Sequence, residues 1–139
     1  DTLRTEMGYP LYGHELDEQT SPIEAGVGAF VAVDKGPFIG QPIFARQKTQ
    51  GVSRRCVAFT MTDRSPPPRP GYAVVVPGAG TDPVGAVTSG TLSPSLGIGI
   101  GLAYVPTAHS RHGTPLEIEI RGRCFPASTA KKPLFHKAV

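Results

Sequence analysis

From residue 54 onward, short runs of alternating apolar and polar residues are separated by proline and glycine. Alternation with period two and an excess of β-branched residues is typical of β-strands. Turns between such short strands favour a small antiparallel barrel or sandwich. The pattern predicts strands at residues 55–61, 72–76, 84–89, 97–105, 116–121 and 124–129, with an extended loop over the proline-rich residues 65–71.

Two helices are predicted before residue 53. Ser21 precedes Pro22 and stands three residues before Glu24, which is the sequence of a capping box and predicts a short helix that continues to about Phe30. Residues 41–49 have a proline in the first turn, good helix formers after it and a glycine just beyond, which predicts a second helix.

The composition agrees with a turn-rich β fold. The 139 residues include 17 Gly and 15 Pro, together about 23% of the chain against a usual share near 12%. This excess disfavours a helical bundle, and the apolar runs between the turns disfavour a disordered chain. No run of about 20 apolar residues is present that would predict a membrane span.

Charge divides the chain into two parts. Residues 1–52 carry seven acidic and four basic residues, whereas residues 53–139 carry four acidic and ten basic residues. We therefore expect two structural units with a boundary near residue 52. The basic second unit raises the possibility of nucleic-acid binding, but aromatic residues are only 7% of the chain and form no stacking motif.

Two motifs that could indicate a binding site, a glycine run and a pair of histidines, are better explained as features of turns and strands. The glycine run at residues 97–101 lacks the third glycine of a nucleotide-binding loop, so we expect these glycines to let strands coil and pack closely. His109 and His112 lie three residues apart without nearby acidic ligands and are interpreted as part of a solvated turn.

Two further groups receive similar structural interpretations. Glu15, Asp17 and Glu18 lie in the same region as His14, which suggests acid–base chemistry, but a solvated acidic loop explains them as well and no paired pocket is evident. Cys56 and Cys124 are far apart in the sequence and are expected to be two buried free thiols, not a disulfide or a metal site.

Seven collinear segments resemble the glycine cleavage system T protein family. Residues 1–8 and 10–18 read D-T-L-R-T-E-M-G and P-L-Y-G-H-E-L-D-E, similar to the family's D-x-L-R-x-E-x-G and P-L-Y-G-x-E-L-D-E. The other similar segments follow in the family's order at residues 21–26, 35–40, 87–96, 102–106 and 118–122. The similarity extends to about Phe135.

The resemblance implies an aminomethyltransferase of glycine cleavage. Such an enzyme takes the one-carbon unit from an aminomethyl group on the lipoyl arm of the H protein, transfers it to tetrahydrofolate and releases ammonia. The implied fold is mainly β, with a small α-containing N-terminal part and a C-terminal antiparallel Greek-key barrel. Residues 1–52 would form the incomplete tail of the folate-binding middle domain and residues 53–139 the barrel, packed against the N-terminal remainder of the same protein.

In that family the catalytic aspartate and a folate-binding arginine precede the position of Asp1. We therefore expect no catalytic residue in this chain and no activity of the chain alone; the spacing of its cysteines and histidines predicts no metal site. The resemblance implies folate contacts from residues near that arginine and in the barrel loop, namely Arg4, Glu6, Ser89, Ser93 and Ser95. For Arg4 the alternative is an Arg–Glu pair that ties the two parts of the chain together.

Two alternatives to this function stay open. One is the homologous folate module of a dimethylglycine or sarcosine dehydrogenase or of a folate-dependent demethylase. The other is a stand-alone barrel that binds nucleic acid or protein, with nucleic acid the less expected partner. The sequence shows no targeting signal and no membrane segment, so we expect a cytoplasmic protein in a bacterium or a mitochondrial one in a eukaryote.

Overall fold

The computed structural model describes residues 1–138. It contains two α-helices, α1 (Thr2–Met7) and α2 (Gln41–Gln50), and two short 3-10 helices, η1 (Gly28–Phe30) and η2 (Thr107–His109). The strands are β1 (Arg54–Met61), β2 (Ala73–Val75), β3 (Gly85–Leu92), β4 (Gly99–Pro106), β5 (Pro115–Ile120) and β6 (Arg123–Ala130). All six strands lie close to the positions that the alternating pattern predicts.

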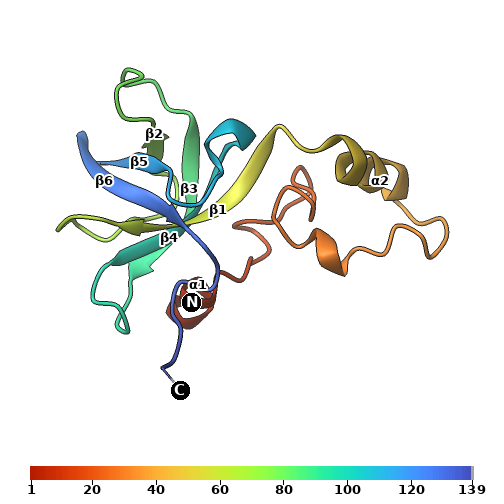
Figure 1. Cartoon of the computed structure of the whole chain (residues 1–139), viewed down its shortest axis with the longest axis horizontal. Coiled ribbons are helices and arrows are strands. Elements are labelled where there is room, and N and C mark those ends of the chain that lie inside the picture. The colour runs from red at the N-terminus through yellow and green to blue at the C-terminus, as the bar shows by residue number, and fades with distance from the viewer. Residues whose placement is uncertain (139) are drawn as a thin grey trace.

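The strands form one closed antiparallel barrel in the order β1-β4-β3-β2-β5-β6 (Figure 1). β2, β3 and β4 are consecutive in the sequence and adjacent in the barrel. β1 pairs with β4 on the far side of this group, and the long connection from β1 to β2 makes that placement possible. This is the Greek-key arrangement. Pairing of β1 with β6, from Ala58 opposite Ala130 to Met61 opposite Ala127, closes the barrel, and the predicted Greek-key barrel is confirmed.

The barrel interior is filled by aliphatic and aromatic side chains from every strand. Phe59 of β1 is fully buried there, and β5 presents alternate residues to the same core, as its sequence pattern requires. β1 and β4 differ because both of their faces are covered. Leu102 and Tyr104 of β4 and Cys56 of β1 form a second buried cluster on the outside of the barrel.

Glycine permits the close approach of β3 and β4. A Cβ atom on Gly101 would lie 2.5 Å from the carbonyl oxygen of Ser89 and 2.6 Å from the ring of Phe59. The ladder between β3 and β4 shifts register between Val87 and Ser89, next to this contact. The expectation that the glycine run allows close packing is therefore confirmed.

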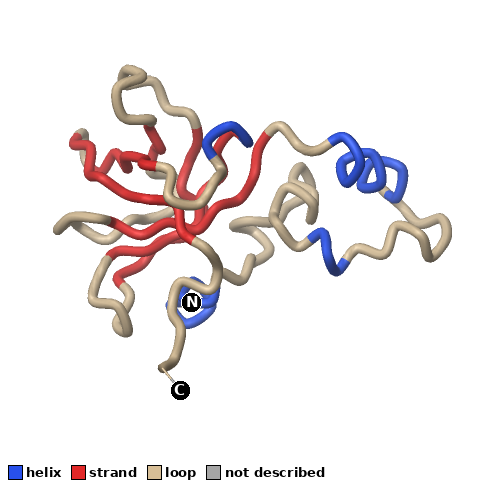
Figure 2. The backbone as a smooth tube through the Cα atoms, in the orientation of Figure 1, coloured by secondary structure: helices blue, strands red, loops and turns tan. Residues whose placement is uncertain are grey.

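The segment before β1 divides into a docked part and a projecting part. α1 packs against β3 and β4, and the chain near the C-terminus runs beside it, since the backbone N–H of Leu134 donates to the Glu6 carbonyl at 2.8 Å. Residues 27–50, which include η1 and α2, extend away from the barrel (Figure 2). This projecting part leaves large apolar side chains in solvent, including Phe30, which is 89% exposed.

Helix α2 confirms the prediction for residues 41–49, but the helix predicted from Pro22 to Phe30 is wrong. Its capping box does form, because the Glu24 N–H donates to Ser21 Oγ at 3.1 Å and the Ser21 N–H donates to the Glu24 carboxylate at 2.9 Å. The chain then turns at Gly26, which has a positive φ of 80°, and only η1 follows. A glycine in this conformation stops the helix that the cap would start.

Within residues 1–138, no helix is long and apolar enough to cross a membrane.

The sequence patterns do not predict α1. It has only six residues, and such a short helix gains its stability from packing and not from its intrinsic propensity.

Candidate functional site

The five residues predicted to contact folate lie together where α1 meets the barrel. α1 supplies Arg4 and Glu6, β3 supplies Ser89, and the loop after β3 supplies Ser93 and Ser95. A sixth residue, Glu15, enters from the turn that follows α1. We call these six residues the polar seam.

Arg4 makes four hydrogen bonds and one further ion-pair contact within the chain. Its Nε donates to Asp1 at 2.7 Å, and Nη1 donates to the Tyr9 carbonyl at 3.1 Å and to Glu15 at 3.2 Å. Nη2 donates to Ser89 Oγ at 2.9 Å and lies 2.6 Å from the Asp1 carboxylate. Since a guanidinium has five N–H groups, a ligand carboxylate would have to displace one of these partners, most readily Asp1, whose side chain is 58% exposed.

Glu15 is the residue that the sequence interpretation placed wrongly. Its side chain is 0% exposed, whereas Asp17 and Glu18 are exposed as expected of a solvated loop. The Glu15 carboxylate accepts from Arg4, from the hydroxyl of Ser89 and from the Leu11 N–H at 3.0 Å. A buried carboxylate is tolerated when its charge is paired and its oxygens are hydrogen-bonded, and both conditions hold here.

An Arg–Glu pair is present as Arg4–Glu15, but both residues lie in residues 1–52, so the pair does not itself join the two parts of the chain; Ser89 makes that connection through its hydrogen bonds with Arg4 and Glu15. The phenol of Tyr104 on β4 strengthens the same junction by donating to the Glu15 carbonyl at 2.8 Å. The Tyr104 pKa is raised, chiefly because its ring is desolvated, so the hydroxyl stays protonated and keeps donating.

Glu6 is the second buried carboxylate of the polar seam and is 3% exposed. It accepts from the Ser93 hydroxyl, from the Ser95 N–H at 3.2 Å and from the Ser95 hydroxyl at 3.1 Å. The Ser93 hydrogen bond lowers the Glu6 pKa most strongly, burial acts in the opposite direction, and the two bonds from Ser95 lower it further. The Glu6 charge is therefore held by hydroxyl and backbone donors and not by a cation.

The two cysteines differ. Cys56 is buried, as predicted, and burial raises its pKa to about 11, so that it is an unreactive thiol at neutral pH. The prediction is wrong for Cys124, which is exposed because it lies on the solvent side of β6 near the Gly122 turn. Both thiols are free.

The histidines do not gather into a site with acidic residues. His109 ends η2 and His112 lies on the turn after it, as the solvated-turn interpretation requires. His14 is near the polar seam, with Nδ1 at 3.1 Å from the Thr88 carbonyl. Among the residues that the structure describes, no group of three or more potential ligands could hold a metal ion.

The polar seam thus acts as a clamp. Glu15 receives donors from both sides of the junction and Glu6 receives donors from Ser93 and Ser95, and together these bonds fix α1 on the barrel. The projecting segment, by contrast, exposes apolar side chains that in a self-contained domain would be covered.

Together these features define a Greek-key barrel module with a helical N-terminal extension clamped to its wall. The model of the family described as "Glycine cleavage T-protein C-terminal barrel domain" matches residues 54–136. The chain belongs to this glycine cleavage T-protein family.

Curated relatives extend the similarity over the whole chain. Proteins named aminomethyltransferase from Nostoc sp. and Symbiobacterium thermophilum are 45% and 48% identical to it over 139 and 136 residues, which are 99% and 97% of this chain. A crystal structure of the glycine cleavage system aminomethyltransferase T from Bartonella henselae superposes with a TM-score of 0.88 at 30% identity over 97% of this chain. The chain spans only 36% and 35% of the length of the two relatives and 37% of the crystallised protein.

Breaking the Arg4–Glu15 pair from one side should be costly. In Arg4→Met the buried Glu15 carboxylate loses its cation, so we expect the free energy of unfolding to fall by about 3 kcal/mol. Adding Glu15→Gln should cost less than the sum of the two single substitutions, by about 1 kcal/mol or more. Chemical denaturation measures these changes. Arg46→Met on the exposed face of α2 is the matched control and should change the free energy of unfolding by about 0.5 kcal/mol or less. If the effects of Arg4→Met and Glu15→Gln were strictly additive, the Arg4–Glu15 pairing would be contradicted.

The polar seam also predicts a pH dependence. Since the folded-state pKa of Glu6 is depressed, its contribution to stability is present above the unfolded pKa of about 4.3 and is lost as the pH falls through the lower folded-state value. The difference in unfolding free energy between the wild type and Glu6→Gln should be constant above about pH 5 and shrink below about pH 4. Urea titrations across this range test it, and a difference that grows on acidification would refute the role of the charged form.

Proposed function

We propose that this chain is the C-terminal portion of a tetrahydrofolate-dependent aminomethyltransferase of glycine cleavage. The enzyme would transfer the one-carbon unit from the aminomethyl-lipoyl group of the H protein to tetrahydrofolate, forming 5,10-methylenetetrahydrofolate and dihydrolipoyl protein and releasing ammonia. The observation that carries the proposal is the 45–48% identity with aminomethyltransferases over nearly every residue of the chain. These relatives favour this function over the homologous dehydrogenase modules and over a stand-alone barrel.

In this proposal the reacting groups lie outside the chain. The family resemblance puts the catalytic aspartate upstream and a folate-binding arginine directly before Asp1. The backbone carbonyl of Asp1 accepts from the N–H of Thr5 at 3.2 Å and from its hydroxyl at 3.1 Å, so Asp1 is part of the first turn of α1. The polar-seam contacts that hold α1 on the barrel would therefore also fix the position of the arginine that the family places before Asp1.

We infer that the polar seam positions the folate-binding arginine and does not itself bind folate. Arg4 is already engaged within the chain, and the carboxylates of Glu6 and Glu15 are enclosed by donors from the barrel. Their contribution to the reaction would be to keep the start of α1 in one place, because a displacement of about 1 Å in a binding group can cost a large part of its effect.

The partners in this proposal are anionic. Residues 53–139 carry ten basic and four acidic residues, and a basic barrel would attract both a polyglutamyl folate and an acidic carrier protein. This attraction would act mainly on the rate of association and would weaken with increasing ionic strength.

An activity assay tests the proposal. The full-length gene product, given aminomethylated H protein and tetrahydrofolate, should form 5,10-methylenetetrahydrofolate and ammonia, whereas residues 1–139 alone should form neither. Arg4→Met in the full-length protein should raise the KM for tetrahydrofolate about tenfold and leave the KM for H protein unchanged. Turnover by the 139-residue chain would overturn the upstream location of the chemistry, and equal rises in both KM values would overturn the positioning role of Arg4.

A further inference from the structure

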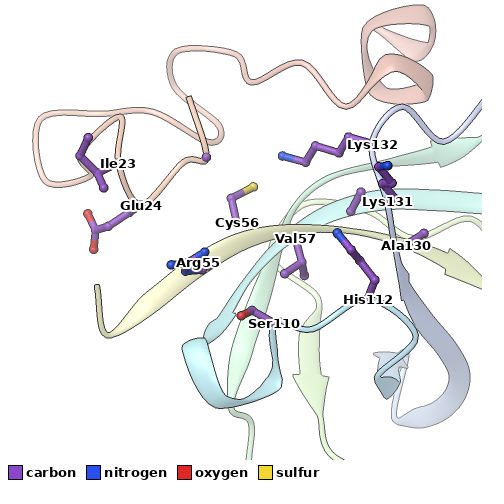
Figure 3. Close-up of a pocket in the computed structure, with 12 residues that line it drawn as sticks. Ile23, Glu24, Arg55, Cys56, Val57, Ser110, His112, Ala130, Lys131 and Lys132 are labelled. Carbon is purple, nitrogen blue, oxygen red and sulfur yellow. The ribbon is translucent and has the colours of Figure 1, made fainter. Parts of the chain in front are cut away.

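A cavity outside the polar seam collects basic side chains. It has a volume of about 340 Å³ and lies between the turn at residues 23–26, strand β1 and the end of β6 (Figure 3). Its basic lining residues are Arg55 on β1, His112 on the turn before β5, and Lys131 and Lys132 just after β6. Its acidic lining residue, Glu24, is already engaged by Arg54 at 3.0 Å and by the N–H of Ser21 at 2.9 Å.

Lys132 is the most enclosed of these bases. Its aliphatic stem lies against Gly8, where a Cβ atom would come within 2.8 Å of the lysine Cγ, and its Nζ lies 3.9 Å from the Cβ position of Gly26. The side chain thus passes between two glycines of the N-terminal segment. Figure 3 shows it extending from the end of β6 toward the thiol of Cys56.

The charge on Lys132 has no acidic partner in the part of the chain that the structure describes. The ion pairs there join Arg4 to Asp1 and to Glu15 and join Arg54 to Glu24, and none involves Arg55, His112, Lys131 or Lys132. Lys132 is only partly buried and Arg55, His112 and Lys131 are exposed, so the unfavourable contribution here is the mutual repulsion of unpaired positive charges around one cavity. An anion in the cavity would remove this cost.

The walls of the cavity suit a small ligand. Ile23, Val57 and Ala130 provide apolar surface, and its volume is at the lower end of the range for small-molecule sites. The bases are placed around this apolar surface and come from three separate parts of the barrel. Such an arrangement can donate hydrogen bonds to several oxygens of one anion.

We propose that this cavity binds a small oxyanion, phosphate or a carboxylate, with Lys132 as its principal cation and Arg55, His112 and Lys131 around it. The site is separate from the polar seam and does not depend on the proposed transferase activity. Phosphate and carboxylate share the chemistry that these bases recognise, so the two are distinguished by experiment.

The test is calorimetric titration of the full-length gene product with inorganic phosphate and, separately, with glutarate, in the absence of folate and H protein. We expect at least one of the two anions to bind with a dissociation constant of about 1 mM or tighter. Lys132→Met retains the unbranched stem and removes the charge, and it should weaken this binding about tenfold or more. Lys137→Met, an equal charge change at an exposed position outside the cavity lining, should bind as the wild type does.

Two additional measurements separate loss of the site from loss of the fold. His112→Gln changes an exposed lining residue and should also weaken anion binding, while the thermal melting curves of all variants are compared. Tighter binding of phosphate assigns a phosphate site and tighter binding of glutarate a carboxylate site. The absence of saturable binding by either anion up to about 50 mM, or equal affinity of the wild type and Lys132→Met, would overturn the proposal.

Discussion

The Glu15 carboxylate is shielded from water, and the junction between α1 and the barrel depends on how its charge is compensated. Arg4 provides the counter-charge, Ser89 and a backbone N–H provide further donors, and Tyr104 holds the backbone of the same turn. Each group comes from a different part of the chain. A buried carboxylate that loses even one of these partners is strongly destabilised. The junction is therefore stable only when all of the partners are in place, and this requirement defines the position of α1.

The barrel supplies the rigid surface for this clamp. β1 and β4 are covered on both faces, and the glycine at position 101 lets β3 approach β4 closely enough to present Ser89 toward α1. The N-terminal segment and the residues after β6 both pack on the outer face of β1 and β4, and so they lie next to each other. The N-terminal segment therefore contributes Glu15 to the polar seam and the turn at residues 23–26 to the wall of the basic cavity.

Local sequence patterns located the barrel well, because each strand is a short alternating run and each turn is marked by proline or glycine. They failed where tertiary contacts decide the outcome. Glu15 looks like a member of an acidic loop until Arg4, Ser89 and Tyr104 are brought to it from 11, 74 and 89 residues away. The gathering of Arg4, Glu6 and the three serines followed from the family resemblance, but their mutual hydrogen bonding required coordinates. The capping box at Ser21 was recognised correctly, and Gly26 overrode it.

The central claim is that the polar seam fixes α1 to the barrel as part of one cooperative unit. Native-state hydrogen exchange tests it directly on the amides of Gly8 and Tyr9, which close α1 through bonds to Thr5 and Arg4 at 3.0 Å. The account predicts opening free energies within about 1 kcal/mol of those of the β4 amides. Exchange of the α1 amides at the rate of a fraying terminus, while β4 stays protected, would contradict it.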